Sequence, residues 1–173
     1  EQLPQGVIAV RDAREVAPPH PLQPGDGVGG VEIAGEVAVA PRGPAEVRDA
    51  VESLGVDRIG HGVRAIDDAS VVEMLAEREI MLEVCPGSNV FLGVFPTLKD
   101  HPIDRLRRAG VRISVSTDDP PFFHTTMRRE YRDLAQSFRW DEAALRAINI
   151  DTMRAAFCDD ATRARILKRW ETI

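Results

Sequence analysis

Cysteine is scarce in this chain of 173 residues, which contains only Cys85 and Cys158. Two widely separated cysteines exclude a disulfide framework, so a reducing, cytoplasmic setting is expected. Long apolar runs are also missing. No stretch approaches the roughly 18 apolar residues of a membrane span, and no basic segment followed by an apolar one marks a secretory leader. We therefore expect no membrane partner.

An excess of positive charge is missing as well. The chain has 22 Lys and Arg against 28 Asp and Glu, which gives a formal net charge of -6. This balance argues against a nucleic-acid surface, because such surfaces contact phosphates through basic side chains. A small-molecule partner is favoured instead. The hydrophobic content of 43% is sufficient for the core of one domain. The chain begins with Glu1 rather than Met, as expected of a fragment or a processed product.

Residues 1–30 are expected to be an irregular N-terminal segment with one short strand over 7–10. Prolines and glycines interrupt the apolar pattern that follows this strand. The glycine cluster over 25–30 precedes an apolar run instead of linking a strand to a helix, as a dinucleotide-binding loop would. The folded domain is expected to span residues 31–173.

From residue 31 onward, short β-type runs alternate with helical patterns, which is typical of a parallel sheet wrapped by helices. The pattern predicts about four strand-helix units and a helical C-terminal part. Gly55 is expected to end the first helix and Asp67 or Asp68 to begin the second. The connection over 85–100 resembles a long functional loop. The predicted strands are 31–33, 57–60, 80–84 and 111–116, and the predicted helices are 44–54, 68–78, 103–109 and several more from 126 to 170.

Chemically active side chains follow three of these strands. They are Glu36, His61, Asp118 and Asp119. Because the carboxyl ends of parallel strands converge on one face, these side chains are expected to gather there. His61 lies between two glycines, which leaves room for a ligand beside the imidazole. Adjacent carboxylates can bind a cation and a substrate nitrogen, whereas the alternative is that one of them caps a helix.

Other candidates have structural interpretations. Cys85 follows the third strand and is interpreted as a packed, unreactive thiol, with a nucleophile or metal ligand as the alternative. His20 and His101 are interpreted as structural, and His124 as a residue at the rim of a site. The alternative interpretation of Glu36 is an exposed glutamate in a solvated loop.

Four segments resemble the adenosine deaminase family in their order and spacing. The segments are Ile-Ala-Gly-Glu (33–36), Arg-Ile-Gly-His-Gly (58–62), Glu-Val-Cys-Pro-Gly-Ser-Asn (83–89) and Ser-Thr-Asp-Asp-Pro (116–120). The stretch 119–124 looks like bacterial adenosine or adenine deaminases. The resemblance implies an α/β fold that is the second half of a TIM-type (β/α)8 barrel. It also implies hydrolytic deamination of adenosine to inosine, or of adenine to hypoxanthine.

The resemblance further implies a Zn²⁺ cofactor and a role for each candidate. Asp118 would be a zinc ligand and Asp119 a hydrogen-bond partner of the purine ring. Glu36 would protonate N1 of the purine, and His61 would orient and deprotonate the zinc-bound water. Zinc lowers the pKa of its water toward 7, which generates hydroxide at neutral pH.

Two departures from the family pattern concern the metal. Ile33 stands where the family has a zinc-binding histidine, and the 173 residues contain no His-x-His pair. Zinc sites normally need at least three protein ligands, so the chain is expected to be inactive alone. Open barrel edges are expected to favour self-association. The alternatives are a non-catalytic remnant that keeps a purine pocket or an oligomer surface, and a different metal-dependent amidohydrolase.

Overall fold

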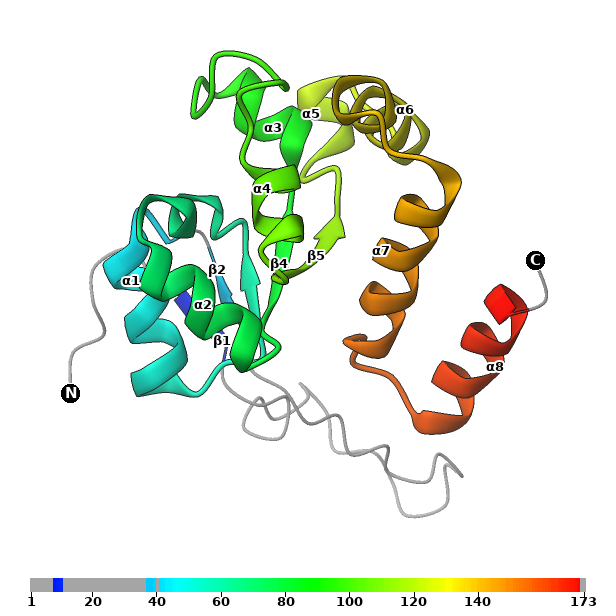
Figure 1. The fold of residues 1–173 in the computed structure, drawn as a ribbon, viewed down its shortest axis with the longest axis horizontal. Helices are drawn as coiled ribbons and strands as arrows, with labels where there is room; N and C mark the ends of the chain where they lie inside the picture. The colour runs from blue at the N-terminus through cyan, green and yellow to red at the C-terminus, as the bar shows by residue number, and fades with distance from the viewer. Residues whose placement is uncertain (1–7, 11–36, 40, 172–173) are drawn as a thin grey trace, which may run out of the picture.

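A five-stranded sheet forms the centre of the molecule (Figure 1). The structure, a computed structural model, describes residues 8–10, 37–39 and 41–171. The strands lie in the order β1-β2-β3-β4-β5; β1 is antiparallel to β2, and the other neighbours are parallel. The parallel part confirms the predicted α/β fold. The strands are β1 (Ile8–Val10), β2 (Val37–Val39), β3 (Arg58–Gly60), β4 (Met81–Val84) and β5 (Arg112–Val115).

Helices connect the parallel strands and continue beyond β5 to the C-terminal part (Figure 1). Most of them coincide with a helical pattern of the sequence. The helices are α1 (Pro44–Asp49), the π-helical turn η1 (Ala50–Leu54), the 3₁₀ turn η2 (Val63–Asp67), α2 (Ala69–Glu77), α3 (Pro86–Phe91), α4 (Ile103–Arg108), α5 (Pro120–Phe123), α6 (Met127–Phe138), α7 (Glu142–Arg154) and α8 (Asp160–Glu171).

The ends of the first helices lie where the sequence predicts them. Pro44 occupies the first turn of α1, and Gly55 adopts a left-handed conformation with φ of 66° after η1. Asp68 caps α2 by accepting a hydrogen bond of 2.9 Å from the backbone N–H of Ser70. A cap of this kind contributes about 1 kcal/mol to stability. Thr126 caps α6 in the same way through the N–H of Arg129.

A single hydrophobic core joins the strands to their helices. Its central members are fully or almost fully buried, and burying one such aliphatic side chain contributes about 1.5–3 kcal/mol. Because these residues alternate along the strands, the register fixes which side chains face the helices. The central members include Ile59, Leu82 and Ile113 from the strands and Val47, Val71, Leu75, Ile103 and Leu106 from the helices.

One local prediction is wrong, and one strand was not predicted. The segment 85–100 does not start as a loop, because α3 begins at Pro86, directly after Cys85. Proline has the φ angle of a first helical turn and no N–H to leave unpaired there. Strand β2, which was not predicted, pairs in parallel with β3 through Val37–Val39. The predicted strand 31–33 lies outside the described residues, and β2 follows Glu36 instead of preceding it.

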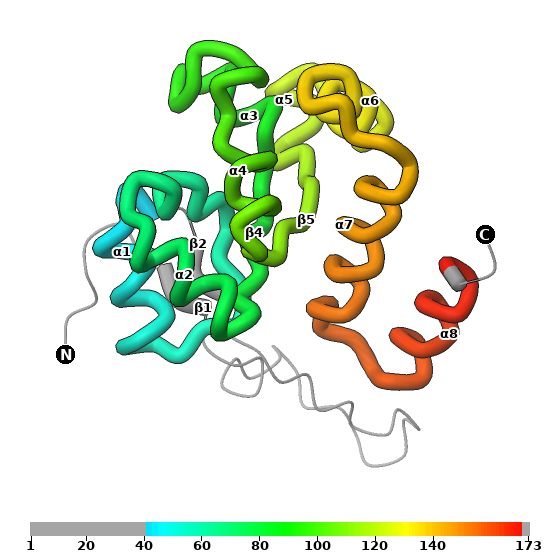
Figure 2. The backbone as a smooth tube through the Cα atoms, in the orientation of Figure 1, coloured from blue at the N-terminus to red at the C-terminus, as the bar shows by residue number. Residues whose placement is uncertain are grey.

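The C-terminal part is helical, as predicted. Helix α7 packs against β5, and α8 packs against α7, an arrangement that the backbone trace in Figure 2 makes clear. A hydrogen bond of 2.6 Å from Arg58 Nη1 to the carbonyl oxygen of Ala155 ties the end of α7 to β3. In the part of the chain that the structure describes, no helix is long and apolar enough to cross a membrane.

Candidate functional site

His61 and Asp118 meet at the carboxyl ends of the parallel strands. His61 directly follows β3, and Asp118 lies three residues after the end of β5. The distance between His61 Nε2 and Asp118 Oδ2 is 3.7 Å. Both residues have positive φ angles, 61° and 54°, which side chains other than glycine rarely adopt and which often mark functional sites. The predicted convergence of these two residues is therefore observed.

The carboxylate of Asp118 is held by two hydrogen bonds. Ser88 Oγ donates to Oδ2 at 2.5 Å, and the backbone N–H of Asp119 donates to Oδ1 at 3.1 Å. Ser88 is buried and lies on α3, so it cannot easily move away. Two donors on different oxygens fix the direction of a carboxylate. Asp118 is thus held in one orientation at the strand ends.

The imidazole of His61 is held by a chain of buried polar groups. His61 Nδ1 lies 3.2 Å from Asn89 Nδ2, and Asn89 Oδ1 lies 3.0 Å from His101 Nε2. The backbone N–H of Ile103 donates to His101 Nδ1 at 3.2 Å. Burial, together with the nearby His61, lowers the pKa of His101 to about 4, so His101 is neutral at pH 7. The structural role predicted for His101 thus extends to the support of His61.

Gly62 makes room for the core and not for a ligand. A Cβ atom at this position would lie 2.9 Å from Leu82 Cδ2 and 3.1 Å from Ile59 Cγ2. Its φ of +63° also disfavours other residues. This glycine therefore lets the turn after β3 pack closely, which brings His61 to the strand end.

Asp119 has a structural function that the sequence analysis gave as the alternative. Its side chain accepts a hydrogen bond of 3.2 Å from the N–H of Phe122 and so caps α5. Asp119 and His124 are both exposed at this end of the sheet. Glu36 and His20 lie outside the described residues.

The donor set near Asp118 only partly suits zinc. Ligand atoms of His61, Cys85 and Asp118 lie within 4.8 Å of one another. Burial and the charge of Asp118 raise the pKa of Cys85 to about 12, so in the absence of metal this group is a thiol at neutral pH, and a metal would have to displace its proton to bind it. Asp118 fits a zinc ligand. Among the described residues, a set of three ligands would need both His61 and the protonated Cys85 beside Asp118.

We expect Cys85 to react with iodoacetamide much more slowly than Cys158 in the folded chain at pH 8. Cys85 is 6% exposed and its thiolate is disfavoured, whereas Cys158 is only half-buried. Intact-mass and peptide mapping over time would measure both rates. The urea-unfolded chain serves as the control, in which both cysteines should react alike. Equal rates in the folded chain would contradict the packed-thiol interpretation.

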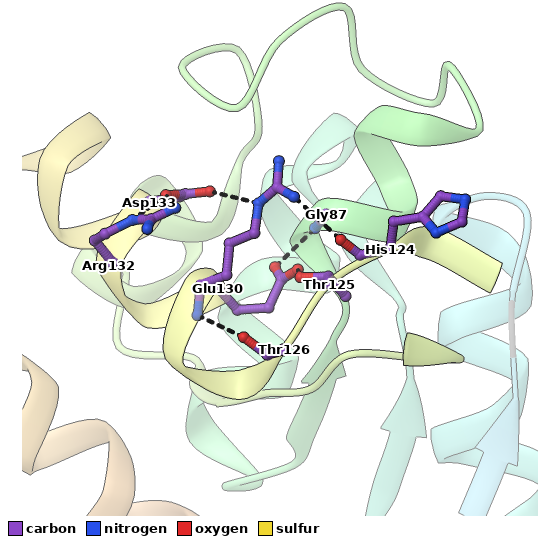
Figure 3. Close-up of polar contacts among 8 residues, drawn as sticks. Gly87, His124, Thr125, Thr126, Glu130, Arg132 and Asp133 are labelled. Carbon is purple, nitrogen blue, oxygen red and sulfur yellow. Dashed lines mark hydrogen bonds and ion pairs between the residues drawn. The ribbon is translucent and has the colours of Figure 1, made fainter. Parts of the chain in front are cut away.

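A buried glutamate anchors the helix that carries Ser88 and Asn89. Glu130, on α6, points toward the start of α3 (Figure 3). Its Oε2 accepts a hydrogen bond of 3.0 Å from the N–H of Gly87, and its Oε1 accepts one of 2.6 Å from Thr125 Oγ1. Glu130 is 5% exposed. Helix α6 therefore fixes the position of α3 and, through it, the two side chains that hold the site.

Sequence reasoning assigned no role to Ser88, Asn89 or Glu130. A signal existed for the first two, because they are polar residues in the first turn after a strand, where the loops of a parallel sheet converge. Glu130 gives no such signal. It lies on a helix among charged residues, and its partner Gly87 is 43 positions away.

A cavity of about 720 Å³ lies at the opposite ends of the strands. Four of its five arginines are paired with acidic groups. Arg58 Nε donates to Glu83 at 2.7 Å, and Arg112 pairs with Glu79. Such pairs leave little charge for a ligand. The carboxyl ends of the strands, with the fixed Asp118 and His61, are the better candidate site.

The adenosine deaminase family model matches residues 27–173. The chain belongs to the adenosine deaminase family. An adenine deaminase of Rhizobium rhizogenes is 49% identical over 143 residues, which is 83% of this chain and 43% of the relative. An adenine deaminase of Agrobacterium fabrum is 46% identical over the same proportions. The chain thus spans less than half the length of these relatives.

Two solved structures match the fold. The adenine deaminase of Arthrobacter aurescens superimposes with a TM-score of 0.75 and 28% identity, over 79% of this chain and 42% of that one. An amidohydrolase of Burkholderia ambifaria with bound zinc gives a TM-score of 0.70 and 27% identity, over 79% of this chain and 39% of that one. These matches confirm the prediction of a partial (β/α) barrel.

Proposed function

We propose that this chain forms the back half of an adenine deaminase, which hydrolyses adenine to hypoxanthine and ammonia. The observation that carries the proposal is the meeting of Asp118 and His61 at the strand ends, in a chain 49% identical to an adenine deaminase. Adenine is preferred to adenosine because the relatives at 43–49% identity carry that name.

Each polar residue of the site has a separate task in this proposal. Asp118 is one zinc ligand, already directed by Ser88. Zinc, when bound, lowers the pKa of a water molecule so that it can attack the purine at neutral pH. His61 faces the same space and orients the attacking group. Asp119 accepts a hydrogen bond from the purine ring. Glu36 protonates N1, a role that rests on its motif alone.

An aromatic cluster beside Asp119 favours a substrate with a flat ring. The ring centroids of Phe122 and Phe123 are 4.9 Å apart, and Phe91 lies 5.4 Å from Phe123. Phe91 and Phe122 are each 59% exposed, which is unusual for phenylalanine in water. Exposed rings at the ends of the strands suit contact with a purine that enters the barrel.

The alternative function is that of a non-catalytic remnant, and Ile33 is the observation that favours it. An isoleucine has no lone pair with which to bind zinc. The enzyme and the remnant would both keep the purine-facing groups. For both we therefore propose a small purine partner, a place in purine metabolism and self-association through open edges. A cytoplasmic setting is proposed for both on the cysteine content.

The test is a chimaera that completes the metal site. The residues of the Rhizobium rhizogenes adenine deaminase that precede the matched part would be joined to this chain, with Ile33→His as a second change. We expect the chimaera to bind about one zinc per chain and to release ammonia from adenine faster than from adenosine. Metal analysis and an ammonia assay give the two readings. The 173-residue chain alone, and the chain with Ile33→His alone, are expected to show no turnover.

One further control and two possible outcomes separate the competing functions. Asp118→Asn in the chimaera should remove zinc and turnover together, because it removes a ligand. A folded chimaera that binds zinc without turning over either purine would support the remnant. Turnover of adenosine in preference to adenine would contradict the proposed substrate.

A further inference from the structure

The polar chain behind His61 starts from a donor whose direction cannot be reversed. A backbone N–H can only donate a hydrogen bond. The N–H of Ile103 lies 3.2 Å from His101 Nδ1, so this nitrogen must carry a lone pair. The nitrogen and oxygen of an asparagine amide are hard to tell apart, but the donor at this end of the hydrogen-bond series is known with certainty.

His101 must then carry its proton on the other nitrogen. The residue is 2% exposed and packs against the ring of Phe95 at a centroid distance of 5.0 Å. Burial lowers the pKa of its imidazole to about 4, so the ring is neutral at pH 7 and holds one proton. That proton lies on Nε2, which is 3.0 Å from Asn89 Oδ1.

This proton fixes the orientation of Asn89. If the amide were rotated, its NH₂ group would face Nε2–H of His101, and two donors would meet in a buried space. An unpaired buried donor costs about 1–3 kcal/mol. Asn89 is 4% exposed, so no solvent relieves this conflict. The oxygen of Asn89 therefore faces His101, and its NH₂ group faces His61.

We propose that Asn89 and His101 are positioning residues that hold His61 in the tautomer with its proton on Nε2. Nδ1 of His61 accepts from the NH₂ group of Asn89 at 3.2 Å. The neutral ring then carries its proton on Nε2, the nitrogen 3.7 Å from Asp118 Oδ2. The backbone N–H of Ile103 thus determines, through His101 and Asn89, which nitrogen of His61 carries the proton.

A proton on Nε2 limits the chemistry that is open to His61. A nitrogen that carries a proton donates a hydrogen bond but neither accepts a proton nor binds a metal. His61 therefore stabilises negative charge on an oxygen near Asp118. The family resemblance implied a base at this position, and the hydrogen-bond chain argues for a donor. This catalytic consequence rests on the proposed function, whereas the tautomer does not.

The test is a long-range ¹H–¹⁵N NMR spectrum of the full 173-residue chain near pH 7, with labelled histidine. The two ring nitrogens of a neutral histidine have well-separated shifts that show which one is protonated. We expect His61 to show a protonated Nε2 and a bare Nδ1. Comparison with the spectrum of His61→Gln identifies its signals. A protonated Nδ1 with a bare Nε2 would overturn the proposal.

Asn89→Asp is the variant that should reverse the pattern. The carboxylate has the same shape but can only accept, so it binds His101 Nε2–H on one side and requires a proton on His61 Nδ1 on the other. We expect Nδ1 of His61 to become protonated. Asn149→Asp is the matched control, since Asn149 binds Tyr131 and the backbone of Leu145 and should leave His61 unchanged.

The result decides the proposal whatever the enzyme does. A bare Nδ1 in Asn89→Asp would contradict it, and so would the same change in Asn149→Asp. If Asn89→Asp does not fold, the wild-type spectrum still reports the tautomer. Neither spectrum needs zinc or turnover, so failure of the adenine deaminase proposal and failure of this one are distinguishable.

Discussion

Replacing Gly87 with alanine is expected to lower the free energy of unfolding by about 3 kcal/mol. A Cβ atom at this position would lie 2.3 Å from Glu130 Oε1 and 3.0 Å from Glu130 Cδ. The carboxylate cannot simply move aside, because it is buried and accepts from both Gly87 and Thr125. Displacement would break both hydrogen bonds and leave a buried charge without its partners, which is among the most destabilising changes to a fold.

Chemical denaturation measured by circular dichroism would test this, with Gly43→Ala as the matched control. Gly43 has an ordinary extended φ of -161°, and a Cβ atom there would have no neighbour within 4 Å. The control should therefore change stability by no more than about 1 kcal/mol. Similar losses for both variants would show that Glu130 does not constrain α3.

The same substitution is expected to disturb the site. Gly87 begins the segment of α3 that carries Ser88 and Asn89, which bind Asp118 and His61. A shift of α3 would move both contacts at once, so the stability of the helix and the geometry of the site are coupled through Glu130. The His61 signals in the NMR spectrum of Gly87→Ala should therefore shift, whereas those of Gly43→Ala should not.

The positions of His61 and Asp118 were predictable because they depend on local pattern and on a general rule of topology. Short apolar runs before each residue predict strands, and parallel strands place their carboxyl ends together. The strand ends found at Gly60 and Val115 agree with this prediction. The side chains that hold the site were not predictable in this way.

Partners far apart in the sequence explain that difference. His61 and Asn89 are 28 residues apart, and Asn89 and His101 are 12 apart. Periodicity indicates which face of an element is buried but not which polar groups meet there. Strand β2 was missed for a related reason, since three residues are too few to establish alternation and its assignment depends on pairing with β3.

His101 should make the fold sensitive to acid. Burial and the nearby His61 lower its pKa from 6.5 to about 4 in the folded chain, so between these values the unfolded chain binds more protons than the folded one. Its contribution is fully present above pH 6.5 and is lost as the pH falls toward 4. A difference of this size corresponds to about 3 kcal/mol of stability between pH 7 and pH 4.

Denaturation of the wild type and of His101→Gln across this pH range isolates the effect. The variant will be less stable at pH 7, because it loses the contact with Phe95. Between pH 7 and pH 4, however, its free energy of unfolding should decrease by about 3 kcal/mol less than that of the wild type. Acidic groups that titrate near pH 4 contribute equally to both proteins and cancel in the difference. His124→Gln removes an exposed histidine and should follow the wild type. Parallel curves for wild type and His101→Gln would mean that His101 accepts a proton inside the folded chain. The structure opposes this, because one ring nitrogen accepts from the N–H of Ile103 and the other already donates its proton to Asn89.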